Sequence, residues 1–84
     1  MKAERKTEIL EQIEEVLKAR HCVIGNSVID TMGDVYVFSF VITDGAVCFK
    51  AMQDIMRLDP QFTDVDVDLV EGKMWLNVTL DTDR

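Results

Sequence analysis

Residues 62 to 80 read FTDVDVDLVEGKMWLNVTL, and the alternation within this stretch decides the fold. Apolar residues occupy every second position from Val65 to Leu69 and again from Met74 to Leu80, which is the pattern of β-strands with one buried face. Glu71 and Gly72 separate the two runs, and glycine allows the backbone conformation of a tight turn. The stretch therefore predicts a β-hairpin.

The turn fixes which residues of this hairpin lie opposite one another. The apolar pairs counted from the turn are Val65 with Val78, Val67 with Leu76, and Leu69 with Met74. The polar pairs are Asp64 with Thr79, Asp66 with Asn77, and Asp68 with Trp75. We therefore expect one face of the hairpin to point into the core and an acidic face to point out.

A helix is predicted just before the hairpin, over residues 45 to 58. Asp44 is a suitable N-cap for it. The helix should end at Asp59 because the residue before Pro60 is pushed out of the helical region. The residues expected to face the core are Val47 or Cys48, Met52, Ile55 and Met56.

Residues 22 to 30 and 35 to 43 predict an earlier hairpin, with Gly33 in its turn. If Met32 and Gly33 form the loop, the pairs on one face are Ile29 with Tyr36, Ser27 with Phe38, Gly25 with Phe40, and Val23 with Ile42. The opposite face then carries Ile24, Asn26, Val28, Val37, Ser39 and Val41. Both faces of the second strand are partly apolar, as expected for a central strand or one at an interface.

Residues 3 to 20 predict the first helix because their apolar residues form a single stripe: Ile9, Leu10, Ile13, Val16 and Leu17. The element order is therefore αββαββ. Two hairpins joined edge to edge give a four-stranded antiparallel sheet with two helices on one face, which is a two-layer α+β sandwich. It is equivalent to a circularly permuted ferredoxin-like sandwich, although the strand order stays open. The length of 84 residues predicts a single domain, 1–84, and oligomerisation often supports a core this small.

The charge balance excludes two classes of partner. Sixteen acidic and nine basic residues give a net charge of −7, which opposes direct binding to nucleic acid or to an anionic membrane. Residues 59 to 84 hold seven of the carboxylates and only two basic residues. No apolar run has the length of a signal peptide or a membrane span. We therefore expect a cytoplasmic protein with an acidic C-terminal third.

The residues needed for catalysis are sparse. His21 is the only histidine, and the end of a helix is a favourable place for it. Cys22 and Cys48 lack metal-binding spacing and predict a buried, reduced pair. A dyad of His21 and Cys48 is conceivable, but no third orienting residue is visible. There is no phosphate-binding loop, zinc ligand set or nucleophile elbow, so we expect neither enzymatic activity nor a cofactor.

Asp64, Asp66 and Asp68 form the most distinctive local feature, since alternation places them on one strand face roughly 6 to 7 Å apart. They are consistent with a solvated strand face, an acidic recognition surface or a metal site. The calcium-loop pattern fails, because Leu69 stands where glycine is needed and Trp75 where glutamate is needed. Trp75 either forms a binding hot spot beside the aspartates or covers the sheet.

These features favour a small acidic intracellular protein-interaction module without catalytic activity, acting as a homodimer. The predicted protein-binding residues are Asp64, Asp66, Asp68, Trp75 and Asn77. The predicted dimer interface is Ile24, Val28, Val37 and Val41. One alternative is an inhibitor of the kind that viruses and plasmids encode, whose aspartates mimic nucleic acid and block a basic nucleic-acid-binding enzyme. A second alternative is a metal-binding domain that uses the aspartate strand.

Overall fold

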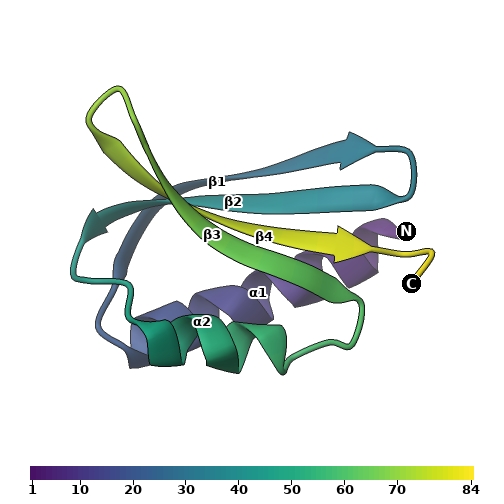
Figure 1. Cartoon of the computed structure of the whole chain (residues 1–84), viewed down its shortest axis with the longest axis horizontal. Helices are drawn as coiled ribbons and strands as arrows, with labels where there is room; N and C mark the ends of the chain where they lie inside the picture. The colour runs from purple at the N-terminus through teal and green to yellow at the C-terminus, as the bar shows by residue number, and fades with distance from the viewer.

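The computed structural model describes all 84 residues, from Met1 to Arg84. Its elements are α1 (Ala3–Ala19), β1 (Val23–Met32), β2 (Val35–Asp44), α2 (Phe49–Met56), β3 (Phe62–Val70) and β4 (Lys73–Asp81). The strands form one four-stranded antiparallel sheet, and both helices lie on one face of it (Figure 1). The predicted two-layer α+β sandwich is therefore confirmed. Neither helix combines the length and the apolar character that crossing a membrane requires.

The strands lie in the order β1-β2-β4-β3. The second strand of each hairpin is central, and β2 pairs with β4 from Val35 opposite Asp81 to Ile42 opposite Met74. This is the order that a ferredoxin-like sandwich has after circular permutation. It leaves β1 and β3 as the two edges of the sheet, and it leaves the face away from the helices uncovered. We call that surface the free face.

The core fills the space between the helices and the sheet. α1 contributes one buried residue per turn, namely Ile9, Ile13 and Leu17. The central strands contribute Phe38 and Phe40 from β2 and Leu76, Val78 and Leu80 from β4, all fully buried. Burial of each such side chain stabilises the fold by about 1.5 to 3 kcal/mol. The core therefore depends on α1 and on the two central strands, and α2 adds only Ala51 and Ile55.

The end of α1 is a Schellman motif with an unusual residue at its key position. Cys22 N–H donates to the carbonyl of Leu17 at 3.0 Å, and His21 N–H donates to that of Lys18 at 2.9 Å. His21 adopts the left-handed conformation, with φ 63°, which glycine usually supplies at this position. The position of His21 is therefore explained by the turn that leads the chain into β1.

The second helix is shorter than predicted, because it begins at Phe49 rather than at residue 45. Gly45 has φ 92°, and a Cβ built there would lie 2.6 Å from the carbonyl oxygen of His21. The chain therefore crosses the end of α1 before it can turn into a helix. The prediction of Asp44 as N-cap was wrong: Asp44 accepts a hydrogen bond from Gly45 N–H, and the N-cap residue is Cys48.

The register predicted for the first hairpin was wrong by two residues. Gly33 and Asp34 form the turn, so Ile29 lies opposite Phe38 and not opposite Tyr36. The face predicted for Ile29 is nevertheless correct, because a shift of two residues preserves the alternation. In the second hairpin all six predicted pairs are confirmed.

A β-bulge between Ile24 and Ser27 changes the start of β1. It places Ile24 opposite Ile42 on the helix side, where Ile24 packs against the core. The prediction that Ile24 lies on the opposite face with Val28 was therefore wrong. Gly25 does not lie under Phe40 either. A Cβ at Gly25 would lie only 2.9 Å from the Cγ2 of Thr43, so the Thr43 side chain would have to shift to admit a larger residue at the bulge.

Two ion pairs tie the helices to neighbouring segments. Arg5 of α1 pairs with the buried Asp59, whose second oxygen accepts a hydrogen bond from Gln61 N–H at 2.8 Å. Arg20 donates to Asp54 of α2 at 2.7 Å, and this hydrogen bond lowers the pKa of the Asp54 carboxyl. The loop between α2 and β3 is therefore fixed to the start of α1, and α2 is fixed to its end.

Replacing His21 by glycine should stabilise the protein. Glycine relieves the left-handed strain at this position, and it also gives the unfolded chain more conformational freedom, which offsets part of the benefit. We expect the free energy of unfolding of His21→Gly to rise by about 0.5 to 1 kcal/mol as the net result. Urea denaturation measures the change. His21→Ala is the control, since it keeps the strain and should not raise the free energy of unfolding. A loss of stability in His21→Gly would contradict this account of the helix end.

Asp59 should contribute to stability through two separable interactions. Asp59→Asn keeps an oxygen for Gln61 N–H but loses the ion pair with Arg5, and we expect it to cost about 1 kcal/mol. Asp59→Ala loses both and should cost about 2 to 3 kcal/mol. Thermal unfolding of the wild type and the two variants tests whether stability falls in the order wild type, Asp59→Asn, Asp59→Ala. Equal effects would show that only one of the two interactions matters.

Candidate functional site

Asp64, Asp66 and Asp68 lie on the free face, along the edge strand β3. We call these three residues the acidic row. Their neighbours on β4 are Thr79, Asn77 and Trp75, as predicted from the turn. Asp64 and Asp68 are exposed, and Asp66 is half-buried. The hairpin therefore brings all five predicted protein-binding residues onto one surface.

Asn77 holds two members of the acidic row in place. Its side-chain nitrogen donates to Asp66 Oδ1 and to Asp68 Oδ2, both at 2.9 Å. Its oxygen accepts a hydrogen bond from Ser39 Oγ at 2.8 Å. Ser39 belongs to β2 and is only 7% exposed, although no helix covers this face. A network of hydrogen bonds thus crosses β2, β4 and β3 and fixes the direction of the Asp66 and Asp68 carboxylates.

Trp75 lies beside Asn77 on the same face of β4. The strand pairing places it between Val41 on β2 and Asp68 on β3. Val41 is only 9% exposed, and a neighbouring side chain of this size accounts for its low exposure. Trp75 itself is half-buried. It therefore covers part of the sheet and leaves the rest of its ring accessible beside the acidic row, and its role as a binding hot spot stays a prediction.

Three of the four residues of the predicted dimer interface lie on the free face. Val28 lies opposite Ser39, and Val37 and Val41 flank Ser39 along β2. Ile24 lies on the other face because of the bulge in β1. Dimer formation through the free face stays a prediction, for which Val28, Val37 and Val41 are the relevant residues.

The histidine and the cysteines lie apart from the acidic row. Cys22 is buried, and burial raises the pKa of its thiol. Cys48 is exposed at the start of α2, so the prediction that both thiols are buried was wrong for Cys48. His21 is exposed and makes no side-chain hydrogen bond to Cys48. The structure brings no nucleophile and base together at these positions.

A metal site on the aspartate strand finds no geometric support. No group of three or more histidine, cysteine, aspartate or glutamate side chains is placed to hold a metal ion. The amide nitrogen of Asn77, a hydrogen-bond donor, lies between Asp66 and Asp68 and occupies one oxygen of each. This geometry does not favour the second alternative, a metal-binding domain.

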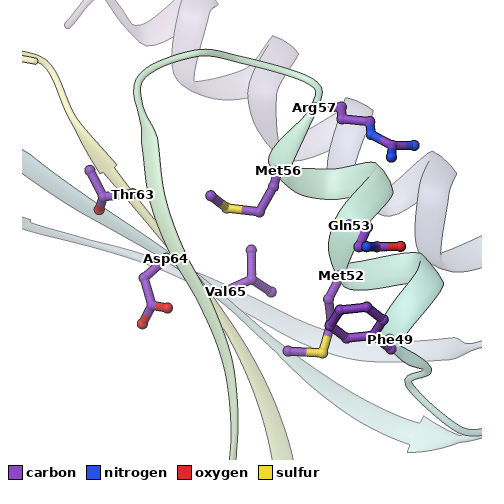
Figure 2. Close-up of a pocket in the computed structure, with 8 residues that line it drawn as sticks. All are labelled: Phe49, Met52, Gln53, Met56, Arg57, Thr63, Asp64 and Val65. Atoms are coloured by element: carbon purple, nitrogen blue, oxygen red, sulfur yellow. The ribbon is translucent and has the colours of Figure 1, made fainter.

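A groove of about 370 Å³ lies on the other side of β3, between this strand and α2. Its lining is Phe49, Met52, Gln53, Met56, Arg57, Thr63, Asp64 and Val65. Figure 2 shows Val65 pointing toward α2 and Asp64 pointing away from it. We call this feature the α2 groove. It shares the strand β3 with the acidic row.

Sequence reasoning missed Phe49, which is 73% exposed on α2. The available signal was its spacing: Phe49, Met52 and Met56 recur at i, i+3 and i+7, a second apolar stripe beside that of Ala51 and Ile55. Met52 and Met56 were predicted to face the core, but Met52 is half-buried and Met56 is exposed. This second stripe lines the α2 groove instead of filling the core.

The apolar surface continues along β3 beyond the groove. Val67 and Leu69 were predicted to point inward, and they do lie on the helix side of the sheet, opposite Leu76 and Met74. No helix reaches them, because the end of the β3–β4 hairpin projects beyond α1 and α2 (Figure 1). Leu69 is 78% exposed as a result. The prediction of burial was therefore wrong for these two residues.

An added carboxylate at position 77 should destabilise the free face. We expect Asn77→Asp to lower the free energy of unfolding by about 1 to 3 kcal/mol at pH 7, since two hydrogen bonds are replaced by repulsion from Asp66 and Asp68. The difference from the wild type should shrink at high salt, which screens the repulsion between the carboxylates. Urea denaturation at low and high salt measures the difference.

Asn26→Asp is the control for this experiment, since Asn26 is exposed on β1, away from the acidic row. It adds the same charge and should change stability by less than about 0.5 kcal/mol. If both variants lose the same stability, the net charge of the protein and not the contact with the acidic row is responsible.

The function has to be argued from the residues and their geometry alone. This chain matches no protein-family model, no curated protein and no solved structure.

Proposed function

We propose that this chain is a non-catalytic protein-binding module whose acidic row, together with Trp75 and Asn77, binds a basic surface of a partner protein. The observation that carries the proposal is the arrangement of Asp64, Asp66 and Asp68. They lie in line on a sheet face that no helix covers, and Asn77 fixes the direction of two of them. Fixed carboxylates bind a partner at a lower entropic cost than mobile ones.

The charges of the acidic row are free to act on a partner. The ion pairs within the chain use other carboxylates, namely Asp59, Glu14 and Asp54. No lysine or arginine of the chain neutralises the acidic row. The net charge of −7 adds long-range attraction for a basic protein, which accelerates encounter more than it strengthens the final complex.

Trp75 supplies the apolar part of this surface. Its indole is half-buried beside Asp68, so it is held in place while part of the ring remains accessible. Tryptophan is among the residues that most often dominate the free energy of binding at protein interfaces. An anchoring ring beside charged groups gives both affinity and orientation, which a solvated acidic strand alone does not.

Removing the charge of the acidic row should weaken capture of the partner. We expect the triple variant Asp64→Asn, Asp66→Asn, Asp68→Asn to bind roughly tenfold more weakly, because each exposed ion pair contributes about 0.2 to 1 kcal/mol. Affinity purification from the native host, with washes at low and high salt, measures the loss. The charge-matched control is Glu8→Gln, Glu11→Gln, Glu15→Gln on the exposed side of α1, which should retain the partner.

Capture that persists in the triple asparagine variant and at high salt would contradict the proposal. The inhibitor alternative differs in one outcome. If the acidic row mimics nucleic acid, added DNA or RNA should displace the partner from the wild-type protein. A basic partner that nucleic acid does not displace would be bound through the acidic row without mimicry.

A further inference from the structure

β3 has an unpaired edge. It is an outer strand of the sheet, and its one neighbour is β4. The backbone hydrogen bonds outside the helices and the strand pairs include none from residues 63 to 70. The amide and carbonyl groups of this segment that face away from β4 therefore have no partner in the chain. Such an edge is a template for a further strand.

The other edge of the sheet, β1, is less regular than β3, since its regular pairing is confined to the segment from Ser27 to Met32. β1 carries two irregularities in its pairing, on either side of Ile24, and bulges of this kind hinder the addition of a strand. In β3 the pairing is irregular only between Phe62 and Asp64, and it is regular from there to Val70. An added strand would therefore find about seven consecutive residues of β3 in regular geometry.

The two faces of β3 differ in chemistry. On the free face it carries the acidic row, and on the helix side it carries Val65, Val67 and Leu69. The α2 groove lies beside Val65, with Phe49 of α2 exposed at its margin. Successive side chains of a strand point to opposite faces, so an added strand would place every second side chain toward the groove and the others beside the acidic row.

A second copy of this chain fits this edge poorly. Antiparallel pairing of β3 with itself puts the free faces of both copies on the same side of the joined sheet. The two acidic rows would then lie side by side, with opposing Cβ atoms roughly 4.5 to 5.5 Å apart, and like charges in this position are destabilising. The edge is therefore complementary to a different sequence.

We propose that β3 accepts an extended segment of a partner protein as a fifth strand of the sheet. Apolar side chains alternate with lysine or arginine side chains along this segment. The apolar side chains enter the α2 groove and cover Val67 and Leu69. The basic side chains pair with the acidic row. This inference rests on the proposed function, since it takes the acidic row as the binding surface, and it adds the conformation and the sequence pattern of the bound segment. Strand addition gives affinity through the backbone and specificity through alternate side chains.

The first test uses synthetic peptides and the full-length chain at low salt. The probe is a fluorescent eight-residue peptide in which lysine alternates with valine or leucine, and anisotropy measures its binding. The composition control carries the same residues with all the lysines first. Two further peptides carry N-methyl groups on the odd-numbered or on the even-numbered amides, because only one of these sets can donate to β3.

The expected result is that the alternating peptide binds at least tenfold more tightly than the composition control. One N-methylated peptide should lose binding at least tenfold, and the other should bind like the unmodified peptide. Equal binding of both N-methylated peptides would overturn strand addition. Strand addition would also be overturned if the composition control bound as tightly as the alternating peptide, or if the alternating peptide did not bind.

The second test uses protein variants at exposed positions, so that the fold is retained. Phe49→Ser and Leu69→Ser should each weaken binding of the alternating peptide several-fold, and the pair should weaken it at least tenfold. Met32→Ser, at an equally exposed apolar residue on the β1 edge, is the matched control and should leave binding unchanged. Circular dichroism tests whether the three single variants and the double variant are folded.

The two proposals fail in different ways. If the triple asparagine variant loses the peptide while Phe49→Ser, Leu69→Ser and both N-methylated peptides bind normally, the acidic row binds a basic partner without adding a strand, and only this inference falls. If the triple asparagine variant binds the peptide and the native partner as the wild type does, the proposed function falls as well.

Discussion

The pairing of β2 with β4 joins the two hairpins into one sheet, and the place of every other element follows from it. Each hairpin by itself has too little apolar area to be stable alone. Side by side, the two central strands present Phe38, Phe40, Leu76 and Val78 to α1 as one continuous surface. The pairing also leaves β1 and β3 with one neighbour each, so it creates the edges and the free face of the sheet.

The polar network on the free face depends on the same pairing. Ser39 reaches Asn77 only because β2 lies next to β4 in the observed register, and Asn77 in turn reaches Asp66 and Asp68 on β3. The carboxylates are therefore positioned by a strand that lies two places away in the sheet. An acidic strand in isolation would carry the same charge with mobile side chains, and it would bind a partner less strongly because their freedom would be lost on binding.

The shortness of α2 determines what the other side of β3 can do. The helix begins only after Gly45 has carried the chain past the end of α1, so it covers Val65 but does not reach Val67 or Leu69. Its second apolar stripe, which includes Phe49, faces the groove rather than the core. The same strand thus has charge on one face and accessible apolar surface on the other, which neither a longer helix nor a fully covered sheet would allow.

The sequence by itself determined the elements, the two-layer class and the register of the second hairpin, because the alternation and the turn at Gly72 are local features within nineteen residues. It thereby placed the acidic row, Trp75 and Asn77 on one face. Tertiary structure decided the rest. The strand order and the exposure of Phe49 depend on which surfaces meet, and the orientation of Ile24 depends on a bulge that accommodates Thr43 beside Gly25. A local pattern such as the spacing of Phe49, Met52 and Met56 shows a second apolar stripe, but it does not decide which surfaces meet, since these contacts join residues far apart in the chain.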